Sequence, residues 1–139
     1  MKKLFFVAAM VLFAGTAFGQ NLQKGSLLGF HTGDIILNPD VTMNQYLSFV
    51  KDKMIPGYEK SFPGVKVYVL KGLRGECPDA ISMLMIFPSE AARDKYFKPD
   101  GGANEAGEAA FKSMNALFEE SNKYVKRMDS DKYTDWLVL

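Results

Sequence analysis

The fold is decided by residues Val65–Phe87, which read VKVYVLKGLRGECPDAISMLMIF. The first run, Val65–Leu70, alternates with three valines on one face, which is typical of a strand with one covered face. The second run, Ile81–Phe87, is apolar at almost every position, which is typical of a strand covered on both sides. Turn-forming residues separate the two runs, so we predict a β-hairpin with a long loop: Gly72, Gly75, Pro78 and Asp79.

A further strand and a helix are expected before this hairpin. Residues Leu27–Leu37 are largely apolar on both alternating faces, which predicts a central strand. Thr42 and Gln45 have the spacing of a capping box, and an apolar stripe follows at helical spacing as far as Met54. Because Pro56 cannot donate a helical hydrogen bond, we expect the helix to kink or restart there.

The second half of the chain repeats helix and strand. Ser89 predicts the start of a short helix, which Pro99–Gly102 interrupts. A longer helix is expected from about residue 104 to 125, followed by a charged connector over Lys126–Lys132 and a last strand over Tyr133–Leu139. The order strand, helix, strand, strand, helix, strand predicts an α+β fold of the ferredoxin-like, split βαβ kind. Its four-stranded antiparallel sheet would carry helices on one face and the first and third strands in the middle.

The apolar residues of these strands exceed what two helices can cover. Met83 and Met85 point to one face of the sheet, and Leu84 and Ile86 point to the other. A naked apolar face of this size favours a second copy stacked face to face, as a homodimer and dimeric α+β barrel. The alternative is a monomer in which the insertion around Pro99–Gly102 folds over that face.

The N-terminus has the pattern of a secretory signal peptide. Lys2 and Lys3 precede the apolar run Leu4–Ala14, and Ala17-Phe18-Gly19 resembles a cleavage site. We therefore predict that residues 1–19 are removed and that residues 20–139 form a single exported domain, periplasmic or extracellular. The apolar run is short for a bilayer span and no second candidate follows, so we expect no stable membrane anchor; a permanent anchor is the alternative.

Charge and cysteine content limit the classes of partner and the disulfides that the chain can have. The chain has 17 basic and 16 acidic residues, and loss of Lys2 and Lys3 would leave a net charge of −1. This balance gives no basic surface for nucleic acid. Cys77 is the one cysteine, so no intrachain disulfide can form. It is interpreted as a small turn residue, with an intermolecular disulfide or a reactive thiol as alternatives.

His31 is the most suggestive candidate for a site. It is the one histidine, and Gly29 and Gly33 flank it on the same face of the predicted strand. One interpretation is a hydrogen-bonding or acid–base His in a small pocket, with Tyr68 and Trp136 as further ligand-binding candidates. The other is a structural His packed under a large neighbour such as Trp136 or Tyr68.

No metal site is predicted. A single histidine cannot supply a site that needs two imidazole ligands. Asp129, Asp131 and Asp135 resemble a sparse calcium loop, but Tyr133 and Thr134 stand where a third oxygen ligand and a glycine are needed. We interpret this segment as a solvated acidic connector.

The pattern resembles the dimeric α+β-barrel superfamily, which includes stress-responsive barrel domains, NIPSNAP proteins and antibiotic-biosynthesis-type monooxygenases. The resemblance is carried by Gly29–Thr32, Met54–Pro56, Phe62–Val65 and the helix start Ser89–Phe97. It implies a small, often aromatic ligand, sometimes haem, between the sheet and its helices. No monooxygenase or haem-degrading residue set of that superfamily can be transferred to this chain, so no cofactor is predicted and haem rests on the resemblance alone.

Three functions follow as hypotheses. The first is an exported homodimer that binds a small apolar or aromatic molecule without transforming it. The second is a cofactor-free monooxygenase or cyclase that uses His31 as its catalytic acid–base group. The third is a non-catalytic structural or protein-interaction role in the cell envelope.

Overall fold

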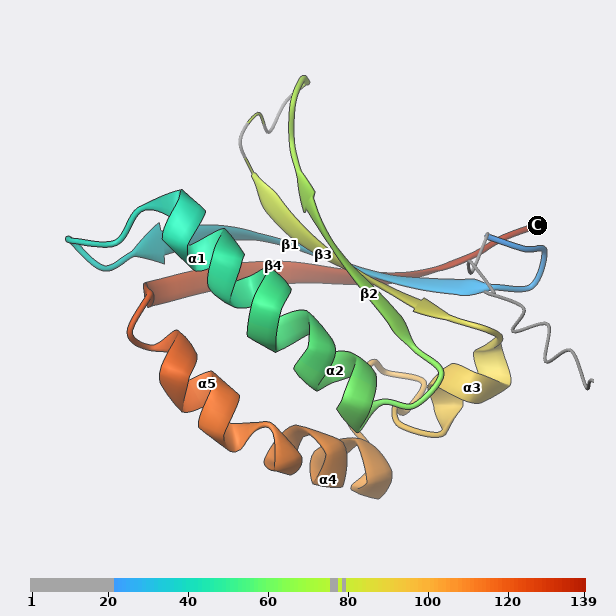
Figure 1. The fold of residues 1–139 in the computed structure, drawn as a ribbon. Coiled ribbons are helices and arrows are strands. Elements are labelled where there is room, and N and C mark those ends of the chain that lie inside the picture. The colour runs from blue at the N-terminus through green and yellow to red at the C-terminus, as the bar shows by residue number, and fades with distance from the viewer. Residues whose placement is uncertain (1–21, 76–77, 79) are drawn as a thin grey trace, which may run out of the picture.

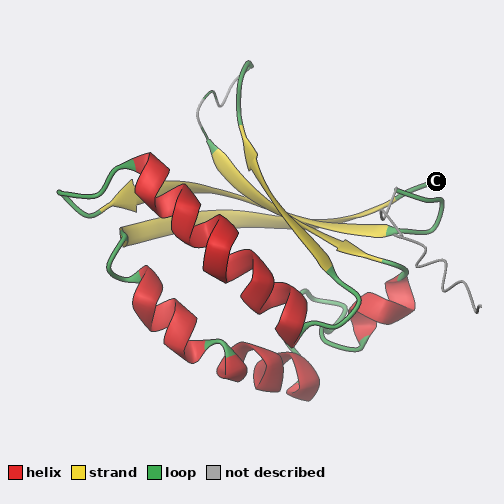
Figure 2. Ribbon diagram, in the orientation of Figure 1, coloured by secondary structure: helices red, strands yellow, loops and turns green. Residues whose placement is uncertain are grey.

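A computed structural model describes residues 22–75, 78 and 80–139, which form an antiparallel sheet with its helices on one side (Figures 1 and 2). The predicted signal peptide and Cys77 lie outside the described residues. The elements in chain order are β1 (Leu27–Leu37), α1 (Met43–Phe49), the π-helix η1 (Val50–Met54), α2 (Ile55–Ser61), β2 (Lys66–Lys71), β3 (Ile81–Phe87), α3 (Glu90–Asp94), α4 (Glu105–Ser113), α5 (Asn115–Ser121) and β4 (Val125–Leu137).

The sheet confirms the ferredoxin-like arrangement. Its strands run in the order β2-β3-β1-β4, and each neighbouring pair is antiparallel. The first and third strands therefore occupy the middle, as the sequence predicts. The predicted hairpin is present as β2 and β3, and its three valines Val65, Val67 and Val69 face the helices.

The last strand is longer than predicted, and the expected connector over Lys126–Lys132 is wrong. β4 begins at Val125 and pairs with β1 along the whole length of that strand, with register shifts after Thr32 and Ile36. It lies at the edge of the sheet, where charged side chains can point into water. Lys126 and Arg127 are exposed, so their charges hide the strand pattern in the sequence.

The predicted helix over residues 104–125 is in fact two shorter helices. α4 ends at Ser113, Met114 leaves the helical conformation with φ −98° and ψ 1°, and α5 ends at Ser121. Met114 is almost completely buried, with 1% exposed. The break turns this side chain into the core.

The first helical segment changes from π-helix to α-helix at the predicted restart, because α2 begins at Ile55. Thr42 and Gln45 form the predicted capping box, with each side chain accepting a backbone N–H of the other residue. The chain then passes through the wider π turns of η1, in which the Ile55 N–H donates to the Val50 carbonyl. Pro56 falls in the first turn of α2, where a helix does not need its N–H.

The buried residues form two clusters beneath the helices. The larger contains Phe62, Phe87 and Met114, which are the largest fully buried side chains. The smaller contains Tyr46, Phe49 and Val50 from α1 and η1. Side chains of both clusters border a cavity, which therefore lies between two separately packed parts of the core.

Candidate functional site

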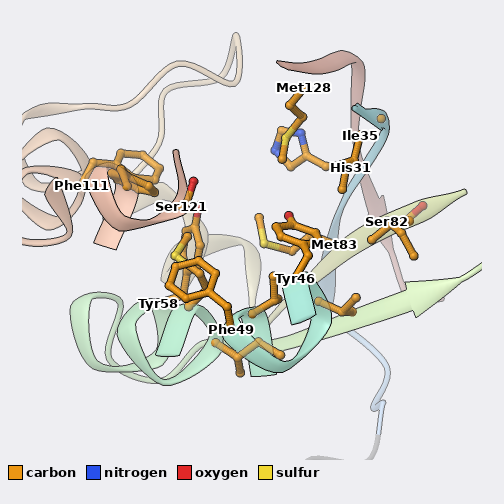
Figure 3. A pocket seen from close by; sticks show the side chains of 17 residues that line it. His31, Ile35, Tyr46, Phe49, Tyr58, Ser82, Met83, Phe111, Ser121 and Met128 are labelled. Atoms are coloured by element: carbon orange, nitrogen blue, oxygen red, sulfur yellow. The ribbon is translucent and has the colours of Figure 1, made fainter. Parts of the chain in front are cut away.

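A cavity of about 450 Å³ lies between the sheet and the helices. In Figure 3, His31 and Met83 reach it from the sheet, while Phe49 and Tyr58 reach it from the first helical segment. Its volume is in the range of small-molecule sites. The residues that line it are His31, Gly33, Ile35, Tyr46, Phe49, Val50, Met54, Ile55, Tyr58, Val69, Ile81, Ser82, Met83, Phe111, Phe118, Ser121 and Met128.

The wall of this cavity is mostly apolar, with a few polar groups. Val50, Met54 and Ile55 come from the π-helix and its junction with α2, so the wide turn forms part of the wall. π-Turns inside helices are frequent at functional sites. Met128 is the most exposed lining side chain, at 50%, so the cavity opens to solvent beside β4.

His31 is the principal polar group of the wall. It pairs across the sheet with Met83 on β3 and Tyr133 on β4, and its ring centroid is 4.6 Å from that of Tyr133. Burial lowers the pKa of His31 below its ordinary value, and attraction by Asp135 partly opposes this. The imidazole is therefore neutral at neutral pH, with one nitrogen able to donate and one able to accept. Among the described residues neither nitrogen has a hydrogen-bond partner, so both are available to a bound molecule.

Tyr133 is held by a hydrogen bond and an ion pair that lead to the buried Arg93. Its hydroxyl donates to the carboxylate of Asp135 at 2.5 Å, and the other oxygen of that carboxylate is 2.9 Å from the guanidinium of Arg93. Arg93 is 4% exposed and also donates to the Lys98 carbonyl. Burial, together with the hydrogen bond to Asp135, raises the pKa of Tyr133 to about 12. Tyr133 is therefore a neutral hydroxyl whose proton is committed to Asp135.

The structure separates the predicted site residues into three groups. His31 and Gly33 line the cavity. Gly29 is buried, and the space where a Cβ would stand is taken by Tyr133, whose hydroxyl oxygen is 2.8 Å away. Tyr68 and Trp136 are 44% and 59% exposed and belong to the opposite face of the sheet, in register with Leu84 and Leu28.

The predicted neighbours of His31 are therefore wrong, because strand alternation places Trp136 and Tyr68 on the far side of the sheet. Tyr133 takes that place. Sequence reasoning missed Tyr133, Asp135 and Arg93. The one signal was the spacing of Tyr133 and Asp135, which puts both on one face of a strand. The position of Tyr133 and Asp135 opposite His31 and Gly29 also depends on the register of β4 against β1.

A second cavity of about 250 Å³ adjoins the first. The two share His31, Tyr58, Met83 and Phe111, so these four side chains form the boundary between them. The remaining walls of the second cavity are Met85, Phe97, Asp100, Gly101 and Tyr133.

The lining residues do not fit haem. Neither cavity has a lysine or arginine among its described lining residues to pair with the two propionates, and unpaired buried carboxylates are costly. Within the described ranges there is no group of three or more His, Cys, Asp or Glu side chains that could hold a metal ion. Nor does the described part of the chain include a helix of the length and hydropathy needed to cross a bilayer.

No protein-family profile matches the chain, and no curated protein matches it. Several solved structures are similar to it. One is a dimeric protein of unknown function with a ferredoxin-like fold from Bacteroides fragilis, with 13% identity, coverage of 82% of this chain and 97% of that chain, and a TM-score of 0.40.

Two others are proposed antibiotic biosynthesis monooxygenases. The protein from Chloroflexus aurantiacus has 13% identity, coverage of 81% of this chain and 93% of its own, and a TM-score of 0.44. The protein from Bacteroides thetaiotaomicron has 19% identity, coverage of 79% and 89%, and a TM-score of 0.37. The solved structures thus include the kinds of protein that the sequence resembles, and similarity at this level assigns no role to any residue of the site.

Proposed function

We propose that the protein binds a small apolar or aromatic molecule in the cavity between the sheet and the helices, without transforming it. The observation that carries this proposal is the 450 Å³ cavity itself, which is lined mainly by apolar and aromatic side chains. Pockets of this size with few, well-placed polar groups are typical of ligand sites. His31 supplies a neutral imidazole as the group that orients the ligand.

A thermal-shift screen of residues 20–139 with small aromatic compounds tests the proposal. A ligand present at a hundred times its Kd stabilises the fold by about 2.7 kcal/mol, which raises the Tm by several degrees. Ser121→Trp, which fills the cavity from α5, should abolish this shift. Lys123→Trp, at an exposed position nearby, is the matched control and should keep it. The absence of stabilisation by any compound would contradict the proposal and favour a structural role.

A second candidate function is acid–base catalysis by His31. The observation that favours it is that His31 borders both cavities while burial lowers its pKa, so that a neutral base is present at neutral pH. The reaction class would be a cofactor-free oxygenation or cyclisation. His31→Ala distinguishes the two functions: loss of turnover with ligand binding retained would favour the enzyme.

We also propose that the protein acts as a homodimer joined through the open face of the sheet. That face carries large exposed side chains on separate strands: Ile36, Tyr68, Leu70 and Trp136 are between 39% and 59% exposed. Large apolar side chains exposed on one face of a sheet favour an interaction surface there. A second copy presents the same surface and can cover it with two-fold symmetry.

Export completes the proposal and rests on the N-terminal pattern alone. Cleavage after Gly19 would give a protein that begins at Gln20. The intact mass of protein recovered from outside the cytoplasm tests this. A mass that still includes residues 1–19 would contradict it.

A further inference from the structure

The two cavities meet at His31 and differ in polarity. The larger is lined mainly by apolar and aromatic side chains, whereas the smaller also has Asp100, a charged residue, among its lining residues. Four side chains border both cavities, so an elongated molecule with one end in each cavity would have to pass between these side chains. The larger cavity suits an apolar body, and the smaller suits a polar head.

The smaller cavity offers hydrogen-bond acceptors. The Tyr133 hydroxyl gives its proton to Asp135, and Arg93 donates to the Tyr133 oxygen, so Tyr133 has no proton to offer a ligand. Asp100 adds a carboxylate, and no lysine or arginine is among the described residues that line this cavity. A head group that donates hydrogen bonds is therefore preferred over one that accepts them.

Asp100 is the one acidic residue among the described residues that line this cavity. Arg93 is buried, and it pairs with Asp135 at 2.9 Å and with Asp94 at 3.4 Å. Among the described residues, the ion pairs of Arg93 are with these two carboxylates and not with Asp100. The Lys98 side chain is exposed and lines neither cavity.

Asp100 is held at the cavity by a tight turn. Lys98 and Gly102 close the turn with a backbone hydrogen bond of 2.7 Å, and the Asp100 side chain accepts the Gly102 N–H at 2.9 Å. Gly101 has a φ of +89°, and a Cβ there would lie 3.6 Å from the Tyr133 ring. The turn therefore packs on Tyr133 and fixes where the carboxylate stands.

Aromatic rings form a large part of this wall. Tyr58, Phe97, Phe111 and Tyr133 all line the smaller cavity. The faces of such rings carry negative electrostatic potential and attract organic cations. The guanidinium of Arg93 already lies over the Phe97 ring, with its central carbon 5.5 Å from the ring centroid.

We propose that the ligand is an amphipathic organic cation, whose apolar body fills the larger cavity and whose protonated amine lies in the smaller one between Asp100 and the aromatic rings. This rests on the proposed binding function and adds the chemical class of the ligand. Asp100 is then the residue that determines specificity for a positive charge.

Three probes with the same apolar body test it by calorimetry on residues 20–139: phenylbutylamine, phenylbutanol and phenylbutanoate. We expect the amine to bind about 5- to 30-fold more tightly than the alcohol, from one partly exposed ion pair and a cation–π contact. The carboxylate should bind least. Asp100→Asn keeps an acceptor for the Gly102 N–H and should lower amine affinity about 3- to 10-fold, with the alcohol unchanged.

Asp52→Asn is the matched control, because Asp52 is an exposed carboxylate of η1 that lines neither cavity. It should leave all three affinities unchanged. Equal binding of amine and alcohol would overturn the cation proposal while leaving the binding function intact. An amine preference that survives Asp100→Asn would overturn the role of Asp100. Binding of none of the three would overturn the binding function and the cation proposal together.

Discussion

The missing side chain of Gly29 makes room for the Tyr133 hydroxyl. A Cβ at Gly29 would stand 2.8 Å from the Tyr133 hydroxyl oxygen and 3.2 Å from the nearest ring carbon. Tyr133 could then not keep its short hydrogen bond to Asp135, on which Arg93 also depends. A single glycine therefore positions a network that reaches from β1 to α3.

We predict that Gly29→Ala lowers the free energy of unfolding by about 1–3 kcal/mol, through overpacking and loss of the Tyr133 hydrogen bond. Urea denaturation measures it. Gly102→Ala is the control, since its Cβ would meet mainly the exposed Asp100 side chain. In a Tyr133→Phe background, Gly29→Ala should lower the free energy of unfolding by less, because the closest clashing atom, the Tyr133 hydroxyl oxygen, is absent. Equal costs with and without that hydroxyl would contradict this explanation.

His31 should make stability depend on pH. Because burial lowers its pKa in the folded protein, the unfolded chain binds the proton more readily over the range between the two pKa values. Stability should therefore fall as the pH drops from about 7.5 to about 5.5, through the ordinary histidine pKa. Unfolding of His31→Gln across that range should show a smaller loss. A variant that loses as much stability as the parent would contradict a lowered pKa.

At the scale of elements, the sequence predicts best where a local rule acts alone. The Thr42 capping box, the alternating valines of β2 and the apolar run of β3 each follow from short-range pattern, and each is present. The ferredoxin-like order follows from them. These features can be predicted without knowing which distant segments pack against them.

The features that the sequence does not predict depend on distant partners. β4 is a strand over Lys126–Lys132 because β1 lies beside it, and its local charge pattern resembles a connector. The pairing of β4 with β1 likewise brings Tyr133 against Gly29 and His31. The candidate site is therefore recoverable from sequence only at His31 and Gly33, whose own strand pattern identifies them.

Gly107 gives a prediction for a helix that contradicts ordinary propensity. In most helices Gly→Ala stabilises by about 1 kcal/mol. In α4, however, a Cβ at Gly107 would overlap the Tyr96 carbonyl oxygen, which accepts the Asn104 N–H that begins the helix. We expect Gly107→Ala to destabilise the protein by about 1–3 kcal/mol in thermal or urea unfolding. The control is the reverse exchange, Ala109→Gly, at an exposed position of α4. It should lower the free energy of unfolding by about 1 kcal/mol, as helix propensity predicts. A stabilised Gly107→Ala variant would show that α4 does not lie this close to Tyr96.

For the whole molecule, the two faces of the sheet separate the two proposed functions, ligand binding and dimerisation. The helix-covered face contains both cavities, while the open face carries Tyr68 and Trp136. The side chain of Met128 lines the cavity on the helix side of the sheet. A second copy stacked on the open face would therefore not cover the opening of the cavity beside Met128. Dimerisation and ligand binding can therefore be separated by mutation.

Trp136 is the one tryptophan of the chain and lies on the proposed dimer face, so its fluorescence reports on dimer formation. We expect residues 20–139 to have the mass of a dimer in light scattering, with a Trp136 emission that shifts to longer wavelength on dilution as water reaches the indole. Tyr68→Glu should give a monomer, because stacking two sheets would bury the new charges without partners. Leu73→Glu is the control: Leu73 is 81% exposed in the hairpin loop beyond the strands, and its replacement should keep the dimer. If Tyr68→Glu and the parent protein are both monomers that bind the same probes, the open face is not an interface between copies and the cavity functions in a single chain.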